Sequence, residues 1–173
     1  MSIQRGTKAV VLFLLVAGSI GVGAPLIVAA SKEADAKKAT ADLKNTKDTK
    51  VKIAALEKLG ELGQIQYGYA QPAIPEMLKA LEDKETGVRA AAAKALGQAG
   101  SEDPDTVPAL VKLLKGDKEE SVKIAAAEGL GLLGAKAKDS VNDLRNAAKD
   151  ADKKGKLAKT IGTSIKSING TKK

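Results

Sequence analysis

The stretch VRAAAAKALGQAG, residues 88–100, recurs twice in the chain with the same order of residue types. The two related stretches are VKIAALEKLGELG (51–63) and VKIAAAEGLGLLG (122–134), and the three align without gaps. Each starts with Val and a basic residue, has a central Ala pair, and ends in Leu-Gly-x-x-Gly. Their starts are 37 and 34 residues apart. Self-similarity at a nearly fixed period predicts a repeat architecture.

Each of these stretches is followed by a second one of a related kind: AIPEMLKALED (73–83), TVPALVKLLKG (106–116) and SVNDLRNAAKD (140–150). Apolar residues recur every three or four positions in both kinds of stretch, which is the period of one helix face. In the first stretch this predicted buried face is Val51, Ala54, Ala55, Leu59 and Leu62. Each unit is therefore predicted to be two antiparallel helices. We expect an all-α solenoid of about three stacked hairpins.

Glycines occur at two kinds of position in the repeated stretch. Those at its end are predicted to stop the helix in a left-handed conformation, namely Gly63, Gly100 and Gly134. Those inside the helix cost about 1 kcal/mol each relative to alanine; they are Gly60, Gly97 and Gly131. We expect these internal glycines where another helix crosses so closely that no Cβ fits.

The composition excludes several kinds of chemistry. The 173 residues include no Cys, His or Trp, and aromatic residues make up 2% of the chain. Disulfides and a cysteine nucleophile are therefore excluded, and the two favoured zinc ligands are missing. We predict no catalytic residue, no cofactor and no metal site. The core must be built from Ala, Leu, Ile and Val.

The first residues have the pattern of an export sequence. Arg5 and Lys8 precede an uncharged stretch from 9 to 30, and a polar segment follows. This order predicts a secretory signal peptide at 1–30, cleaved after Ala30. The alternative is an uncleaved anchor, because 22 uncharged residues can cross a bilayer of about 30 Å. We expect residues 31–173 to be a single exported domain, either periplasmic or secreted, or anchored to the inner membrane of a bacterium by residues 9–30.

The units resemble HEAT repeats, in particular the short class found in phycobilisome lyases and many bacterial proteins. The resemblance rests on PEMLKAL (75–81) before DKETGVRAAAAKALG (83–97), and on PALVKLL (108–114) before DKEESVKIAAAEGLG (117–131). It covers roughly 48–150. Residues 31–47 would then form a degenerate outer helix. The basic segment 151–173 would be an irregular cap that keeps only Ile161-Gly162 of the pattern.

The resemblance also implies a structural ladder. In HEAT repeats an Asp in the turn between helices and an Arg six residues later typically take part in hydrogen bonds along the stack. Asp83 and Arg89 match this pattern, and Asp117 and Lys123 match its spacing. The corresponding Asp48 lies only four residues before Lys52, so the first unit is atypical.

The second helix of each HEAT unit lines the concave side, so by resemblance its outer positions are candidate binding residues. They are Glu57, Glu61, Lys94, Gln98 and Glu128, with Leu132 beside them. Their signs alternate, which argues against a polyanion site there, and we expect no nucleic-acid partner.

Two other segments are open to more than one interpretation. Tyr67 and Tyr69 lie in QIQYGYAQ (64–71), an expected loop, where they either contact a partner or cover the edge of the first repeat. Residues 149–173 carry a net charge of +6, whereas 31–148 are neutral overall. The basic end is either a solvated cap or a binder of anionic polymer or membrane surface.

These observations predict an exported, non-catalytic scaffold that binds another protein through its concave face. Two alternatives stay open: a bilin-lyase-like enzyme subunit, implied by the resemblance, and an anion binder that uses the basic end. Contact with a membrane is expected only through an uncleaved N-terminal segment. About three repeats are near the minimum for a stable stack, so self-association that covers an exposed end is a further expectation.

Overall fold

A computed structural model of the chain describes residues 23–170, and every regular element in that range is a helix. The elements are α1 (Gly23–Asn45), α2 (Thr49–Ile65), α3 (Tyr67–Ala70), η1 (Gln71–Ala73), α4 (Ile74–Ala80), α5 (Thr86–Gln98), α6 (Thr106–Gly116), α7 (Glu120–Leu133), η2 (Gly134–Ser140), α8 (Val141–Asp150) and α9 (Lys156–Asn169). The predicted all-α solenoid is confirmed.

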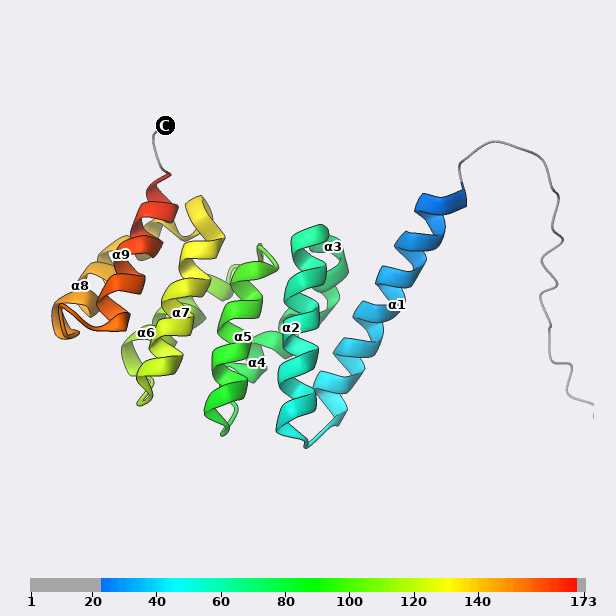
Figure 1. Ribbon diagram of the computed structural model, residues 1–173, viewed down its shortest axis with the longest axis horizontal. Coiled ribbons are helices and arrows are strands. Elements are labelled where there is room, and N and C mark those ends of the chain that lie inside the picture. Colours follow the sequence, from blue (N-terminus) through cyan, green and yellow to red (C-terminus); the bar gives the residue numbers. More distant parts are fainter. Residues whose placement is uncertain (1–22, 171–173) are drawn as a thin grey trace, which may run out of the picture.

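The helices form two rows (Figure 1). Helices α2, α5, α7 and α9 lie side by side and form the front row, and each packs on the next. Helices α4, α6 and α8 form the back row, and α1 packs beside α2 at the N-terminal end of the stack. Each front-row helix buries a leucine or isoleucine completely between the rows: Leu59, Leu96, Leu130 and Ile161.

The internal glycines lie where front-row helices cross, as predicted. A methyl group built on Gly97 would be 2.5 Å from the Cα of Gly129 on α7. The same construction on Gly60 meets Ala95 Cα at 3.2 Å, and on Gly131 it meets Ser164 Cα at 2.9 Å. Small residues on both sides therefore let the helix backbones approach closely, which explains the alanine-rich composition of the repeated stretch.

Two of the three predicted helix stops have the expected conformation. Gly100 and Gly134 follow their helices with φ of +63° and +58°. The prediction for Gly63 was wrong, because this residue lies inside α2, which continues to Ile65. A Cβ on Gly63 would lie 2.5 Å from Ala99 Cα, so Gly63 is a further crossing point. Close packing, and not backbone reversal, requires glycine there.

Helix α1 is longer than the outer helix predicted at 31–47. It starts at Gly23 and runs through Ala30 without a break, and the residues before it lie outside the described range. Its second half packs on the stack through Ala36, Ala39 and Leu43, whereas Val28 near its start is exposed. Among residues 23–170, no helix combines the length and apolar character needed to span a bilayer.

The basic C-terminal segment is a regular part of the stack and not an irregular tail. Helix α9 buries Leu157, Ile161 and Ile168 and covers α7. Its register differs from the prediction based on Ile161-Gly162, because Gly162 faces open space while Ser164 faces Gly131. The Ser164 hydroxyl donates a hydrogen bond of 2.7 Å to the carbonyl of Ala127, so Ser164 takes the place that Gly129 takes against Ala93.

The first front-row helix departs from its predicted buried face. Val51 is 39% exposed and Ala54 is exposed, although Val88 and Val122, which align with Val51, are fully buried. In α5 and α7 this side of the helix packs on the preceding unit. On α2 the neighbour is α1, which packs on the stack through Ala36, Ala39 and Leu43 and leaves Val51 and Ala54 exposed.

The start of α8 differs from what its local sequence suggests. The spacing of Ser140 and Asp143 resembles a capping box, in which the serine side chain accepts a backbone hydrogen bond. Instead the Ser140 hydroxyl donates to the carbonyl of Ala137 at 2.6 Å, and Ser140 caps no N–H of α8. The preceding 3-10 turn η2 places this carbonyl within reach.

Candidate functional site

The exposed side of the front row, here called the front face, carries the residues predicted to bind. Glu57, Lys94 and Glu128 lie on the neighbouring helices α2, α5 and α7, with Glu57 and Lys94 exposed and Glu128 half-buried. None of the three forms an ion pair with another described residue. The front face thus presents negative, positive and negative groups in succession.

A second row of predicted residues runs along the same face. Glu61 is exposed and pairs within its helix with Lys58 at 3.7 Å, and Gln98 is half-buried against Gly60. The row ends on Leu132, which is 50% exposed. Half-buried aliphatic side chains lie on the same helices, namely Ile53, Ala90, Ala91 and Ile124. The front face therefore combines alternating charge with the exposed apolar side chain of Leu132.

The front face extends onto α9, which sequence reasoning missed. Ser164 occupies the place of Gly129, so the preceding residue Thr163 extends the row that contains Glu128. Thr163 is exposed, and its hydroxyl donates to the carbonyl of Thr160 at 2.7 Å. The sequence did not indicate this position of Thr163, because the Ile-Gly dipeptide of α9 suggests a register that differs from the true one by one helical turn.

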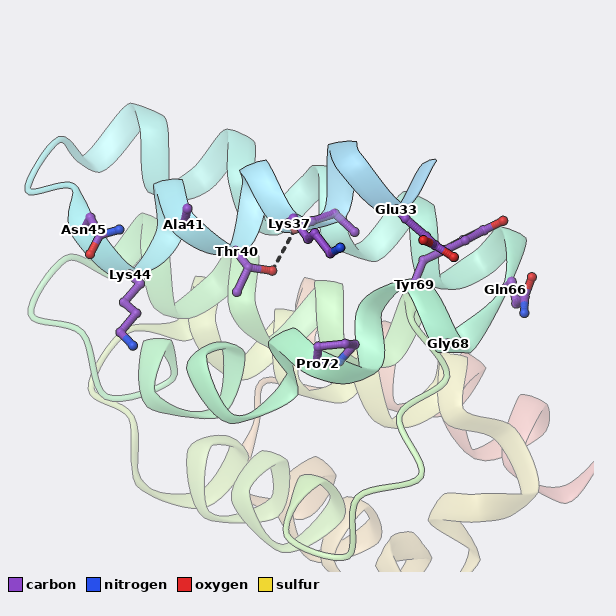
Figure 2. Close-up of a pocket in the computed structure, with 11 residues that line it drawn as sticks. Glu33, Lys37, Thr40, Ala41, Lys44, Asn45, Gln66, Gly68, Tyr69 and Pro72 are labelled. Atoms are coloured by element: carbon purple, nitrogen blue, oxygen red, sulfur yellow. Dashed lines mark hydrogen bonds between the residues drawn. The ribbon is translucent and has the colours of Figure 1, made fainter. Parts of the chain in front are cut away.

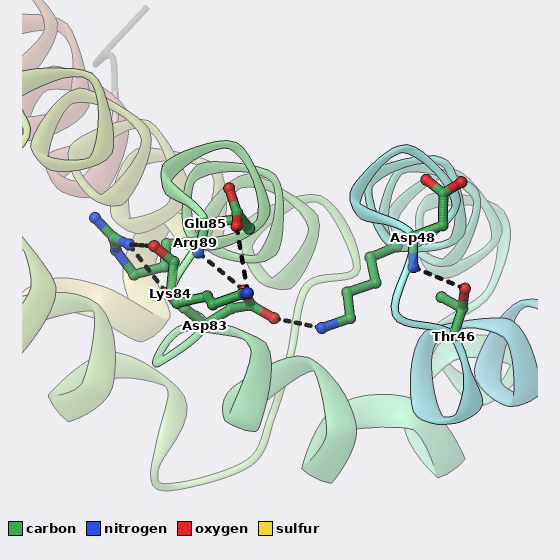
Figure 3. A network of polar contacts seen from close by, with 7 residues as sticks. Thr46, Asp48, Asp83, Lys84, Glu85 and Arg89 are labelled. Carbon is green, nitrogen blue, oxygen red and sulfur yellow. Dashed lines mark hydrogen bonds and ion pairs between the residues drawn. The ribbon is translucent and has the colours of Figure 1, made fainter.

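The polar ladder predicted along the stack exists, but its ion pairs join different units. Figure 3 shows the pair of Asp83 with the lysine of the preceding unit, and Arg89 beside its own turn. Arg89 lies within hydrogen-bonding distance of both carboxylate oxygens of Asp117 in the next unit, at 2.7 and 3.1 Å. Toward its own turn, Arg89 donates only to the backbone carbonyls of Asp83 and Lys84. The paired side chains are 10% and 6% exposed.

Each ion pair that joins two units is here called a rung of the ladder. The hydrogen bonds of the Arg89–Asp117 rung shift the pKa values of both side chains. The hydrogen bond from Arg89 lowers the pKa of Asp117 below its ordinary value, although burial acts in the opposite direction. The bond to Asp117 raises the pKa of Arg89 in turn. A planar guanidinium that bridges two turns holds both in one geometry. Its role is to fix one unit against the next.

The neighbouring rungs are weaker or open. Lys52 contacts Asp83 at 2.5 Å, and the side chains are 24% and 12% exposed. Burial raises the pKa of Asp83, but hydrogen bonds from Lys52 and the backbone N–H of Glu85 outweigh it and hold the pKa below its ordinary value. The third predicted ladder cation, Lys123, makes no ion pair within residues 23–170.

The turn before α9 explains the open third rung. Asp83 and Asp117 each accept a backbone N–H two residues on, and Asp152 does the same with Lys154. Asp152 is therefore the corresponding turn aspartate, but it is exposed and not paired with Lys123. Position 123 is a lysine and has no guanidinium group. The third rung therefore lacks a bidentate bond like that of Arg89.

The two tyrosines lie in helical turns and not in the predicted loop. Tyr67 begins α3 and packs half-buried on the core, and the ammonium nitrogen of Lys136 lies 6.0 Å from its ring centre. Lys136 also pairs with Glu102 at 3.0 Å. Tyr67 therefore covers the first repeat, the structural alternative considered from the sequence.

Tyr69 lines a groove of about 520 Å³ between α1 and the α3–η1 segment (Figure 2). Ala36, Ala41 and Gly68 keep the groove open, and polar groups of Glu33, Lys37, Thr40, Lys44, Asn45 and Gln66 surround it. The α3–η1 segment, which connects α2 to α4, forms the wall of the groove that faces α1. The sequence analysis gave this segment only as a loop that contains Tyr67 and Tyr69.

Comparison with models of known protein families assigns this architecture to a family. The model of the family described as HEAT repeats matches residues 36–131 and again 74–161. The chain belongs to the HEAT-repeat family. The two overlapping matches include all four front-row helices in whole or in part, which agrees with the register of the HEAT stack described above.

One solved structure, described as an engineered protein from a structural genomics consortium, has the same fold with a TM-score of 0.58 and 20% sequence identity. The alignment covers 83% of this HEAT-repeat chain, and the chain spans 64% of the length of the engineered protein. No curated protein matches the sequence. HEAT repeats are helical scaffolds that commonly mediate protein–protein interaction, and the family is generally non-catalytic.

Proposed function

We propose that this HEAT-repeat protein is an exported, non-catalytic adaptor that binds another protein through its front face. The observation that carries the proposal is the row of Glu57, Lys94 and Glu128, whose charges alternate across three packed helices and form no ion pair with other residues of 23–170. A polyanion would meet two repulsive carboxylates in this row. A folded protein with complementary charges and an apolar contact for Leu132 matches it.

Export is supported by the sequence of the N-terminal segment. Arg5 and Lys8 followed by an uncharged stretch over 9–30 direct the rest of the chain across a membrane, whether the segment is removed or kept as an anchor. Fractionation of the native cells, with N-terminal sequencing of the protein, tests this part. Recovery of the full chain in the cytosol would contradict it.

A pair of matched lysines tests the front face. A photo-crosslinking residue placed at Lys94 should capture a specific envelope protein, whereas the same residue at Lys112 should not. Lys112 is a suitable control because it lies on the back-row helix α6, is 80% exposed, and pairs with Glu82. The substitution Lys94→Glu should weaken the captured interaction at least tenfold, since it places three acidic groups in succession. Equal capture from both positions would contradict a front-face site.

A second candidate function is binding of an anionic polymer or surface through the C-terminal end of the stack. It is supported by a set of exposed lysines on α9 and the turn before it: Lys153, Lys154, Lys156, Lys159 and Lys166. Because α9 covers α7, its deletion would expose core residues and could not test binding alone. Combined Lys→Gln substitutions should instead abolish any salt-sensitive binding to polyphosphate while the helical spectrum is kept.

A further inference from the structure

The N-terminal end of the front row exposes positions whose counterparts on α5 and α7 are buried, most clearly Val51, which aligns with Val88 and Val122. On α5 and α7 this side packs on the preceding front-row helix, and Val88, Ala95 and Val122 there are almost inaccessible. The aligned positions on α2 are Val51 and Lys58, and the exposed Ala54 lies between them. Helix α1 contacts α2 but leaves this part of its surface exposed, and no second front-row helix within residues 23–170 covers it.

The exposed side forms a regular stripe, here called the end stripe. Its residues are Val51, Ala54, Lys58, Glu61 and Ile65, spaced three and four positions apart along α2, and Glu61 lies where the stripe borders the front face. Ile65 is 62% exposed, the largest value among the large apolar side chains of the described chain. Alternate spacings of three and four place residues on one seam, as in pairs of helices that pack along their length.

We infer that the end stripe is the docking surface for a second copy of this chain, with the two α2 helices antiparallel about a two-fold axis. In this register Lys58 of each copy lies opposite Glu61 of the other. Ala54 lies opposite Ile65 at both ends of the seam. The stripe is thus self-complementary in charge and in side-chain size, as a two-fold interface requires.

The charge pattern specifies this arrangement. Lys58 and Glu61 are three residues apart, on either side of the proposed axis. Within one chain, Lys58 Nζ lies 3.7 Å from Glu61 Oε2. Two copies in the same orientation would place like charges opposite each other at both positions. The antiparallel pair instead forms two equivalent ion pairs flanked by two apolar contacts.

The opposite end of the stack excludes head-to-tail growth. The position that is Gly60, Gly97 and Gly131 in the first three front-row helices is Lys166 on α9, in the register given by Ser164. Lys159 and Lys166 are both exposed there, so another helix could approach only by burying two positive charges. The open end can therefore pair with a second open end but not with the C-terminal end.

Charge reversal tests the interface in the purified full chain in a mild detergent, with mass measured by sedimentation equilibrium. The wild-type chain should dimerise, and Lys58→Glu and Glu61→Lys should each weaken dimerisation at least tenfold. An equimolar mixture of these two variants should recover the dimer, because each ion pair then joins opposite charges. The double variant K58E/E61K should also recover it, because both ion pairs return with their signs exchanged. Recovery in the mixture shows that the single variants are folded.

A thiol test fixes the register. The chain has no cysteine, so each introduced thiol is unique. A mixture of Ala54→Cys and Ile65→Cys chains should form a mixed disulfide, whereas each variant alone should stay unlinked because its own thiols are about eleven residues apart along the seam, roughly 16 Å at the helical rise. Lys94→Cys and Lys112→Cys serve as controls on the two other faces.

Several results would overturn the inference. These are a wild-type chain that stays monomeric at concentrations of tens of micromolar, a mixture of the charge variants that fails to recover the dimer, or disulfide formation that does not depend on mixing. If dimerisation is unchanged in the charge variants, the dimer contact lies elsewhere on the molecule. Monomers whose end stripe crosslinks to a different protein would show that another partner occupies it.

Discussion

Helices α5 and α2 carry the same thirteen-residue pattern but differ in what surrounds them. Helix α5 lies between α2 and α7, so Val88 is fully buried and Gly97 touches the α7 backbone. Helix α2 has a front-row neighbour only on its α5 side, and Val51 is 39% exposed. The comparison shows that position in the stack, and not the residue itself, decides whether this pattern acts as core or as surface.

The polar ladder repeats the same contrast. The rung that follows α5 is a bidentate pair between Arg89 and Asp117, and its side chains are 10% and 6% exposed. The rung that follows α2 is a single contact between Lys52 and Asp83, with side chains that are 24% and 12% exposed. The middle of the stack therefore holds the ion pair with the larger consequence for stability.

The largest expected difference between the two regions concerns these rungs. Asp117→Ala should lower the free energy of unfolding by about 3–5 kcal/mol, because it leaves the buried Arg89 guanidinium without its partner. Asp83→Ala is the matched substitution and should cost less, since Lys52 can turn its ammonium group toward solvent. Urea unfolding of both variants measures the difference. Equal losses would contradict the ranking of the rungs.

The pH dependence of stability in the wild-type chain and in Asp117→Ala provides the control for this prediction. The pKa of Asp117 in the folded chain lies below its unfolded value of about 3.9. Its contribution is therefore complete above that pH and is lost as the pH falls through the lower, folded value. Below pH 4 the wild-type chain should lose more stability than Asp117→Ala, and parallel curves would show that the rung contributes nothing.

The next largest effect is expected at the glycine of the α5–α7 crossing. Gly97→Ala should cost about 1–3 kcal/mol or more, because the new methyl group would meet backbone atoms of Gly129 and force the helices apart. Gly162→Ala on α9 is the matched change in open space. It should raise stability by about 0.5–1 kcal/mol, since alanine favours the helix. Thermal unfolding of the two variants should shift the midpoint in opposite directions.

The smallest predicted difference compares the two aligned valines. Val88→Ala should cost about 2 kcal/mol, from the transfer of two buried methyl groups and the cavity they leave. Val51→Ala should cost less than about 1 kcal/mol, because Val51 is partly solvated in the single chain. Denaturant unfolding at low protein concentration checks this. Similar losses would mean that another element covers α2 even when the chain is dilute.

Much of the fold could be predicted from particular residues. The recurrence of Leu-Gly-x-x-Gly predicts the stacked hairpins, and the internal glycines predict the helix crossings. The prediction for Gly63 failed because a helix-stop glycine and a crossing glycine look alike in sequence. The register of α9 was missed for a similar reason, since Ile161-Gly162 imitates the pattern while Ser164 makes the contact.

The candidate sites depended more on three-dimensional context. Glu57, Lys94 and Glu128 could be assigned to one face because they occupy the same repeat position. The groove beside Tyr69 and the partners of Arg89 could not be assigned, because they join segments whose relative placement depends on how α1 and the α3–η1 segment pack. A ladder pattern within one unit gives no information about which unit supplies the carboxylate.

By itself, the sequence determined that this chain forms paired helices, that they stack through small residues, and that Cys- or His-based chemistry is excluded. These properties are local, since period, glycine spacing and residue type are written along one segment. Only the tertiary structure decided which copy of the thirteen-residue pattern is buried and which is exposed. It also decided which basic side chain pairs with which carboxylate. Those outcomes depend on neighbours along the stack, because α5 has a front-row helix on both sides and α2 has one on a single side.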